Sequence, residues 1–337
     1  METFKLMRAA DADDAIRSAR DTNNASTVRP GAPMRFLAGG TTLLDLMKLD
    51  VEQPSQVIDI NRIGLDRIET TAQGGVRLGA LVRNSDLARD PYIEEHYAVL
   101  SQALLSGASA QLRNMATTGG NLLQRTRCVY FRDVASACNK RQPGSGCSAM
   151  EGMNRNLAIL GTSDHCIATN PSDMNVALTA LEATIHIQGT SGERAVAIDD
   201  FFLLPGTTPQ HETVVQPGDL ITYVSLPPPM RGRRSVYLKL RDRASYEFAL
   251  ASAAVSVSLV AGQIEFARIA MGGIGTRPWR MREAEAALQG RAADRGTFRA
   301  AAEVALAGAR PQSENGFKIE LAKRCLTHAL SLATQSA

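Results

Sequence analysis

Four cysteines lie close together in the middle of the chain, and thiols are the residues here most able to hold a metal. They are Cys128, Cys138, Cys147 and Cys166, separated by 9, 8 and 18 residues, whereas Cys325 stands alone near the C-terminus. This spacing fits neither the common zinc fingers nor the ferredoxins, in which cysteines are paired a few residues apart. Spacing alone therefore leaves three interpretations open: a metal site, disulfides or unrelated thiols.

The residues around these cysteines favour a metal site. Four thiolates on an iron–sulfur cubane form an anionic centre that nearby cations stabilise, and adjacent glycines free backbone N–H groups to hydrogen-bond the sulfurs. The glycines are Gly144 and Gly146, and the cations are Arg125, Arg127, Arg132, Lys140 and Arg141. From about residue 124 to 170 the sequence has little periodicity, which indicates one irregular loop, and a loop this long is usually functional or disordered.

Two glycine turns form a second group of residues with possible chemistry. Each could point several backbone N–H groups at one anion, and threonine hydroxyls could add hydrogen bonds. Neither turn fits GxGxxG or the P-loop pattern, so either could also be a purely structural tight turn. The first turn is Ala38, Gly39, Gly40, Thr41 and Thr42, and the second is Thr117, Thr118, Gly119, Gly120 and Asn121.

The elements that must position these groups are a mixture of strands and helices. We expect a strand and a helix on either side of the first turn, a helix over 87–107 that ends at Gly107, and a helix over 171–183. Alternating hydrophobic residues predict strands at 56–60, 75–80, 183–189, 235–240, 249–260 and 263–273, followed by two C-terminal helices. Because strands and helices do not alternate regularly, the fold class is α+β rather than a doubly wound sheet.

Length and composition agree with a globular protein of two or three domains. The chain has 337 residues, 44% of them hydrophobic and 21% charged, and a net charge of +3. That charge is too small to indicate nucleic-acid binding, and we expect neither a membrane-spanning segment nor a secretion signal. The proline-rich stretch 227–234 is the best junction, which gives expected domains 1–228 and 229–337.

Three segments in this order resemble the FAD-binding medium subunit of the xanthine dehydrogenase family of molybdenum hydroxylases. They are FLAGGTTLLDLMK, ASAQLRNMATTGGNL and IAMGGIGTRPWR. The resemblance implies a two-part FAD domain of the PCMH (vanillyl-alcohol-oxidase-like) type, then a smaller α+β domain of the CO dehydrogenase flavoprotein type. It also implies that the two glycine turns hold the FAD diphosphate, that Asp173 contacts a sugar, and that Lys239 and Tyr246 lie near the isoalloxazine ring.

The cysteine loop resembles a narrower group, the flavin subunits of periplasmic aldehyde oxidoreductases, which carry an additional [4Fe–4S] cluster. This implies that Cys128, Cys138, Cys147 and Cys166 are the cluster ligands. His165 would then be a neighbour of the cluster, and Cys325, within a predicted helix, a core residue. The cluster could be an electron relay, or it could have the structural role of stabilising the loop, and we favour the structural role.

The resemblance also implies partners and a place in electron transfer. A large molybdenum-cofactor subunit would oxidise aldehydes to carboxylic acids, a small subunit with two [2Fe–2S] clusters would pass electrons to FAD, and an external acceptor other than nicotinamide would remove them. The heterotrimer would be periplasmic, exported with a signal-bearing partner, or else cytoplasmic. We expect no nucleic-acid partner and no catalytic residue for the substrate reaction in this chain.

Other functions remain open at this stage. One is the flavin subunit of a 4-hydroxybenzoyl-CoA reductase-type or xanthine dehydrogenase-type enzyme. Another is a self-sufficient flavoenzyme, which would need its own substrate pocket and catalytic base. A third is a zinc-binding interaction module, which would be colourless, whereas flavin with iron and sulfide would be yellow-brown.

Overall fold

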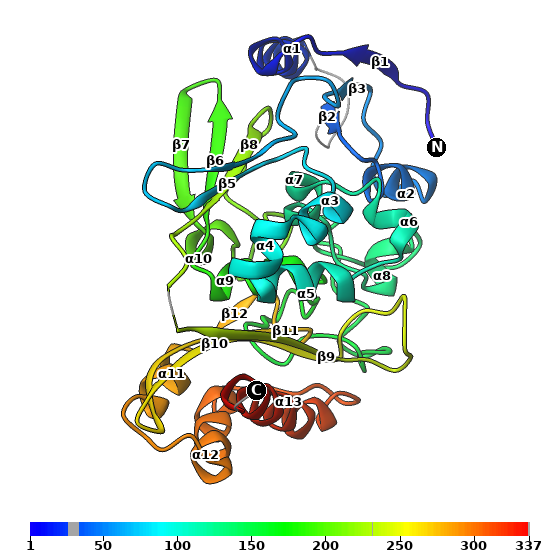
Figure 1. Ribbon diagram of the computed structural model, residues 1–337. Helices are drawn as coiled ribbons and strands as arrows, with labels where there is room; N and C mark the ends of the chain where they lie inside the picture. The colour runs from blue at the N-terminus through cyan, green and yellow to red at the C-terminus, as the bar shows by residue number, and fades with distance from the viewer. Residues whose placement is uncertain (26–33, 231, 336–337) are drawn as a thin grey trace.

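The structure, a computed structural model, describes residues 1–25, 34–230 and 232–335, with the side chains of 22–25 left aside. It contains three β-sheets with helices between and below them (Figure 1). None of the described helices is long and apolar enough to cross a membrane.

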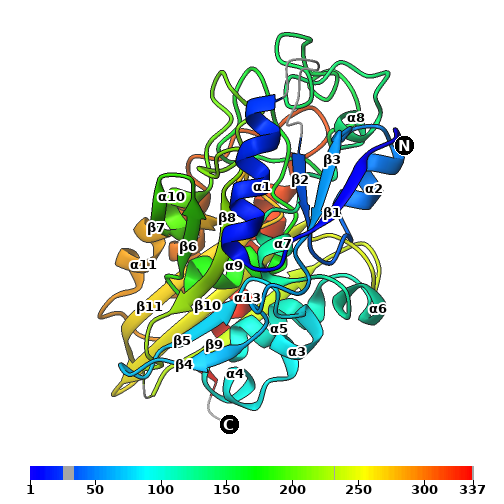
Figure 2. The same cartoon turned by 90° about the horizontal axis from the view of Figure 1, so that it is seen from above.

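A small parallel sheet forms the N-terminal end of the molecule. Its strand order is β1-β3-β2, and both β1 and β2 pair with β3. Helix α1 contacts this sheet and β8 of the next one, so it lies between the two sheets (Figure 2). The elements are β1 (Lys5–Arg8), α1 (Ala12–Ala25), β2 (Met34–Leu37), α2 (Leu43–Lys48) and β3 (Gln56–Asp59).

A five-stranded antiparallel sheet follows, in the order β4-β5-β8-β6-β7. One of its central strands, β8, comes late in this half of the chain, so the cysteine loop and β6 and β7 are all inserted between β5 and β8. The strands are β4 (Ile68–Thr70), β5 (Val76–Gly79), β6 (Thr184–Gly189), β7 (Gly192–Ala197) and β8 (Leu220–Leu226).

The single helix expected over 87–107 is wrong in one respect, because the structure divides this region into three short helices. Pro91 begins the second of them, and Asp90 before it is extended and caps it by accepting a hydrogen bond from the Ile93 N–H. A proline disfavours helical backbone at the preceding residue, so the break is local in origin. The expected end at Gly107 is confirmed. The helices are α3 (Asn84–Arg89), α4 (Pro91–His96) and α5 (Ala98–Ser106).

The C-terminal part is a four-stranded antiparallel sheet in the order β12-β11-β10-β9, covered on both faces. One face packs on α5 and α9, and the other on the C-terminal helices, of which there are three rather than the expected two (Figure 1). Cys325 is buried among those helices, as expected. The elements are β9 (Arg234–Leu240), β10 (Ala251–Val260), β11 (Gln263–Gly272), β12 (Trp279–Arg280), α11 (Arg282–Leu288), α12 (Arg295–Leu306) and α13 (Phe317–Thr334).

The two halves of the chain share one hydrophobic core. Tyr237, Ala254 and Ala270 of the C-terminal sheet are buried in the same cluster as Met174 and Val176 of α9. The C-terminal sheet therefore covers one side of the helical layer and forms one wall of any cavity between the two. The remaining helices are short: α6 (Ala110–Arg113), α7 (Thr118–Leu122), α8 (Val129–Arg132), α9 (Asp173–Ala180) and α10 (Ile198–Phe201).

Candidate functional site

The first glycine turn connects β2 to α2 and packs directly against the segment that leads into the second turn. A Cβ on Gly39 would lie 1.8 Å from the backbone oxygen of Met115. No side chain fits at that separation, so only glycine allows the two backbones to approach this closely. Gly40 has a φ of +74°, which also favours glycine.

The second glycine turn forms the start of α7. The Thr117 hydroxyl accepts a hydrogen bond from the Gly120 N–H at 3.2 Å and so caps this helix. A Cβ on Gly119 would lie 3.1 Å from Ala80, which fits the burial of this glycine against the end of β5. The turn is therefore held rigidly by its own cap and by the neighbouring strand.

A cavity of about 850 Å³ lies between the two turns. This volume is within the range of cofactor pockets. Thr118 and Gly119 are buried behind the cavity wall, and Asn121 hydrogen-bonds Ser172. The predicted residues that line the cavity are Ala38, Gly39, Gly40, Thr41, Thr42, Thr117 and Gly120.

A second cavity, of about 150 Å³, adjoins the first at Thr169, Asn170 and Pro171, which line both. Its opposite wall belongs to the C-terminal part of the chain and includes Phe248 and Gly273. The two cavities together extend from the glycine turns to the C-terminal sheet. An elongated ligand could therefore be held at both ends.

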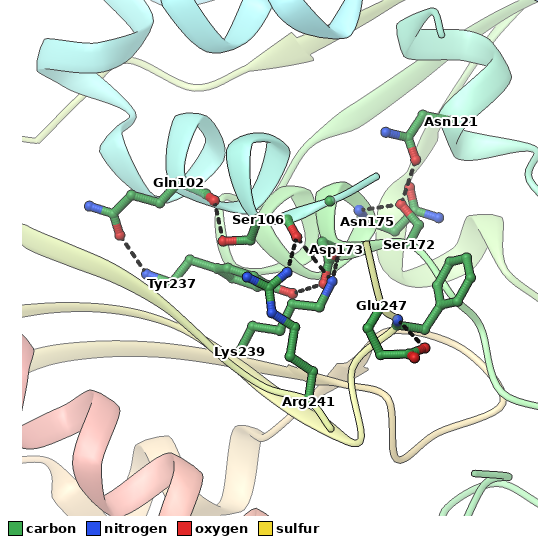
Figure 3. Close-up of polar contacts among 12 residues, drawn as sticks. Gln102, Ser106, Asn121, Ser172, Asp173, Asn175, Tyr237, Lys239, Arg241 and Glu247 are labelled. Carbon is green, nitrogen blue, oxygen red and sulfur yellow. Dashed lines mark hydrogen bonds and ion pairs between the residues drawn. The ribbon is translucent and has the colours of Figure 1, made fainter. Parts of the chain in front are cut away.

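Asp173 lines this second cavity and is joined there to two residues of β9 (Figure 3). Its carboxylate accepts hydrogen bonds from Lys239 Nζ at 2.8 Å and from the Tyr237 hydroxyl at 2.5 Å. Burial, reinforced by the negative charge of Asp173, raises the pKa of Tyr237 well above its usual range, so Tyr237 stays a donor. Lys239 also donates to the carbonyl oxygen of Ser106.

Tyr246 lies apart from this group. It is 56% exposed on the β9–β10 loop and has a φ of +52°. The neighbouring Phe248, rather than Tyr246, lines the second cavity, together with Arg127 of the cysteine loop. Neither Phe248 nor this position of Arg127 could be predicted from the sequence, because nothing local indicates that the two loops meet.

The cysteine loop brings its four thiols to one small cavity, lined by Cys128, Cys138, Cys147 and Cys166. Cys138 and Cys147 are paired opposite each other in a short antiparallel bridge. Backbone N–H groups of Tyr130 and Phe131 hydrogen-bond the Cys128 sulfur. Those of Ala149, Met150 and Ile167 hydrogen-bond the Cys147 sulfur, and that of Ala168 hydrogen-bonds the Cys166 sulfur. Such N–H···S contacts favour thiolates.

Polar side chains within the loop hold this arrangement. Arg141 Nη1 donates to the carbonyl oxygens of Tyr130 and Phe131, each at 2.8 Å. Asn139 accepts from the Gly146 N–H at 2.9 Å and donates to the His165 carbonyl oxygen at 3.1 Å. The loop is irregular, as expected, but its backbone polar groups are extensively paired.

Burial raises the pKa of the Cys128 thiol to about 11 and also raises the pKa of Cys147 and Cys166. Without a cation these groups are neutral thiols. Among the described residues no group of three or more histidine, cysteine or carboxylate side chains is placed to hold a single metal ion. The four cysteines share a cavity but do not converge on one point.

The cations around the cysteines have partners that differ from expectation. Arg127 and Arg132 share Asp45 of α2, at 3.3 and 2.8 Å. Arg125 and Lys140 both pair with Glu212. Burial by itself would raise the pKa of Glu212, but the positive charges of Arg125 and Lys140 outweigh this effect and lower that pKa to about 2. No local sequence pattern marks Glu212 as a partner of these cations.

An α+β scaffold with two glycine turns around a cofactor-sized cavity defines a dinucleotide-binding protein. Comparison with known proteins specifies which class. Residues 2–229 match the FAD binding domain in molybdopterin dehydrogenase, and residues 236–333 match the CO dehydrogenase flavoprotein C-terminal domain. The chain belongs to the FAD-binding medium-subunit family of the molybdenum hydroxylases, which are oxidoreductases. The predicted family and fold are thereby confirmed.

Individual relatives cover nearly the whole chain. The aldehyde oxidoreductase FAD-binding subunit PaoB of Escherichia coli K12 is 51% identical over 91% of this chain and 93% of its own length. The glyceraldehyde dehydrogenase medium chain of Sulfolobus acidocaldarius is 29% identical over 84% of this chain and 79% of its own. The solved carbon monoxide dehydrogenase of Hydrogenophaga pseudoflava has a chain that superposes with a TM-score of 0.76 at 25% identity, covering 98% of this chain and 97% of that one.

Proposed function

We propose that this chain is the electron-transfer subunit of a heterotrimeric molybdenum-dependent aldehyde oxidoreductase. It would receive electrons from two [2Fe–2S] clusters of a small subunit and deliver them to an external acceptor other than nicotinamide. Substrate would be oxidised on a large molybdenum-cofactor subunit. The observation that carries the proposal is the pair of adjoining cavities, which extends from the glycine turns to Asp173, the partner of a buried lysine on the C-terminal sheet.

FAD, when bound, supplies two-electron redox chemistry, and the chain's own residues would orient it. Backbone N–H groups of the first glycine turn would bind the diphosphate, and Gly39 lets this turn pack closely on the Met115 segment. In the second turn the N–H groups of Thr118, Gly119, Gly120 and Asn121 already donate to Val82, Ala80 and Thr117. This turn would therefore hold the ligand through Thr117 and Gly120, which line the cavity. Thr117 keeps the second turn in shape through its cap. The isoalloxazine ring would occupy the smaller cavity, against Asn170 and Phe248.

The buried ion pair at that cavity would set the charge near the ring. Lys239 and Asp173 have side chains only 3% and 8% exposed, so their charges are poorly screened by water. Lys239 would stabilise negative charge on the reduced ring. Asp173 would hold the Lys239 ammonium group in place and would also contact a sugar of FAD. Tyr246, from its exposed loop, would screen the ring from solvent.

We further propose that Cys128, Cys138, Cys147 and Cys166 bind a [4Fe–4S] cluster. Four thiols around one cavity, with backbone N–H groups on their sulfurs, fit the donor set of such a cluster. Each thiolate of a cubane binds a different iron atom, so the sulfurs lie farther apart than around a single ion. The cluster would stabilise the loop, since the main route to FAD runs through the small subunit.

Aldehyde is the substrate class that the relatives favour. An aldehyde oxidoreductase subunit and a glyceraldehyde dehydrogenase chain are both among the matches. We also propose a periplasmic complex exported with a signal-bearing partner, because the cysteine loop resembles that of periplasmic aldehyde oxidoreductases. Cell fractionation would test this against a cytoplasmic complex.

Anaerobic purification of the chain with its partner subunits tests the proposal. We expect stoichiometric FAD, molybdenum, and iron and acid-labile sulfide in excess of the two [2Fe–2S] clusters. The complex should oxidise aldehydes and leave CoA thioesters unchanged. Purification as a single catalytically active chain would instead indicate a self-sufficient flavoenzyme, and zinc in place of iron would indicate an interaction module.

A further inference from the structure

Five charged side chains form a continuous row of ion pairs along the wall of the large cavity. Arg35 Nη2 lies 2.7 Å from Glu52 Oε2, and Arg125 Nη1 lies 2.7 Å from Glu52 Oε1. Arg125 Nε lies 2.8 Å from Glu212 Oε2, and Lys140 Nζ lies 2.7 Å from Glu212 Oε1. All five residues line the cavity. We call this row the wall network.

The wall network is largely removed from solvent. The side chains of Glu52 and Lys140 are 9% and 10% exposed, and that of Glu212 is 26% exposed. Three cations alternate with two carboxylates, so each carboxylate lies between two positive charges. Loss of either carboxylate would leave neighbouring cations uncompensated, which is costly in a partly buried site.

The network connects segments with separate tasks. Arg125 follows α7, which carries the second glycine turn, and Glu52 follows α2, which begins directly after the first turn. Lys140 belongs to the turn between Cys138 and Cys147. Glu212 comes from the loop before β8 and pairs with Lys140, whereas Glu52 pairs with Arg125 at the start of the cysteine loop but not with Lys140.

The cysteine cavity and the large cavity also share a physical wall. Cys166, Ala168 and Lys140 line both. On the other side of the network, the Arg125 guanidinium lies 4.5 Å from the ring centroid of Phe131, a fully buried residue that lines the cysteine cavity. A rearrangement of the cysteine loop would therefore move atoms that border the large cavity.

From this geometry we infer that Glu212 is a positioning residue that makes flavin retention depend on the assembled cysteine loop. The inference rests on the proposed function, because it requires FAD in the large cavity and a cluster on the four thiols. Glu212 holds Lys140 of the loop and Arg125 of the glycine-turn segment in one place. When the loop loses its metal, Lys140 leaves Glu212, so the Glu212–Arg125 pair is no longer held to the loop and the cavity wall opens.

The first arm of the test uses the wild-type complex, so that folding of a variant is not at issue. After FAD, iron and sulfide have been quantified, the cluster is removed anaerobically with a ferrous-iron chelator, and release of FAD is followed by its fluorescence. The [2Fe–2S] clusters of the small subunit are monitored separately by their electron paramagnetic resonance signals. We expect FAD release to become about tenfold faster or more, since a buried ion-pair network loses one member.

The second arm compares two variants. Glu212→Gln keeps the size of the side chain and removes its charge, so FAD release should be fast already and should respond little to removal of iron. Glu303→Gln removes the carboxylate of a more exposed ion pair, with Lys323 between α12 and α13, and should behave as wild type. If Glu212→Gln does not fold, Lys140→Gln replaces it, because that change leaves Glu212 paired with Arg125.

Each outcome has one meaning. Faster FAD release after cluster removal in wild type, but not in Glu212→Gln, supports the coupling. Unchanged FAD release from wild type after cluster removal, or wild-type behaviour of Glu212→Gln, overturns it while leaving the proposed function intact. Wild-type complex that contains flavin but no iron beyond the [2Fe–2S] clusters would refute both the cluster and the coupling.

Discussion

Lys239 Nζ lies 2.8 Å from Asp173 Oδ2, although 66 residues separate the two in the chain. Lys239 comes from the C-terminal sheet and Asp173 from the first turn of α9, so this ion pair joins the two family domains at the smaller cavity. Because the Tyr237 hydroxyl donates to the other carboxylate oxygen, Asp173 is fixed from two directions.

Replacement of Lys239 by methionine should destabilise the protein by about 3–5 kcal/mol, because it leaves the Asp173 carboxylate buried without its counterion. Denaturant unfolding of the purified chain would measure this. The double variant Lys239→Met with Asp173→Asn removes both charges and should recover part of the loss. A single variant as stable as wild type would mean that water already compensates Asp173.

Gly39→Ala should lower FAD affinity by about tenfold or more, equivalent to about 1.4 kcal/mol. The added Cβ would lie 1.8 Å from the Met115 oxygen, so the first turn and the segment leading into the second turn must move apart. Flavin content and FAD titration of the apoprotein are the measurements. Gly308→Ala is the matched control, since a Cβ there meets nothing within 4 Å. Equal affinity for both variants would show that FAD binding does not depend on the close approach of Gly39 to Met115.

Stability should fall in acid as Glu212 is protonated. Its pKa is lowered from the ordinary 4.5 to about 2 in the folded chain, so its contribution is complete above about pH 4.5 and is lost as pH falls toward 2. The size should be about 1–3 kcal/mol, because part of the side chain is exposed and screened. Urea unfolding between pH 2 and 6 would measure it. The free energy of unfolding of Glu212→Gln should fall less than that of wild type as the pH is lowered through this range. Parallel curves for the two proteins would contradict this assignment.

Arg141→Met should reduce the iron content of the chain and lower its melting temperature. The guanidinium donates to the carbonyl oxygens of Tyr130 and Phe131 in α8, which follows Cys128, and buried carbonyl groups left unpaired cost about 1–3 kcal/mol. Iron and sulfide analysis with calorimetry would report both effects. Arg324→Met, which removes an exposed pair with Glu320, should change neither. Full iron in Arg141→Met would show that the cysteines hold their places unaided.

Local features of this protein could be predicted because they depend on neighbours in the chain. The glycine turn between a strand and a helix, the helix end at Gly107 and the irregular cysteine loop follow from backbone preferences of a few residues. The division of 87–107 into three helices is also local, since Pro91 disfavours helical backbone at Asp90.

Tertiary structure alone decided which charges meet. Arg125 lies 87 residues from Glu212 and 73 from Glu52, yet it contacts both. No local pattern indicates such partners, because they depend on where β8 and the loop before it come to lie. The sequence by itself determined that glycine turns and thiols were present. The packing of the sheets decided that the first turn contacts the segment before the second, that the thiols share one cavity, and that a row of ion pairs connects the turns with the cysteine loop. Electrostatic pairing acts through space and not along the chain.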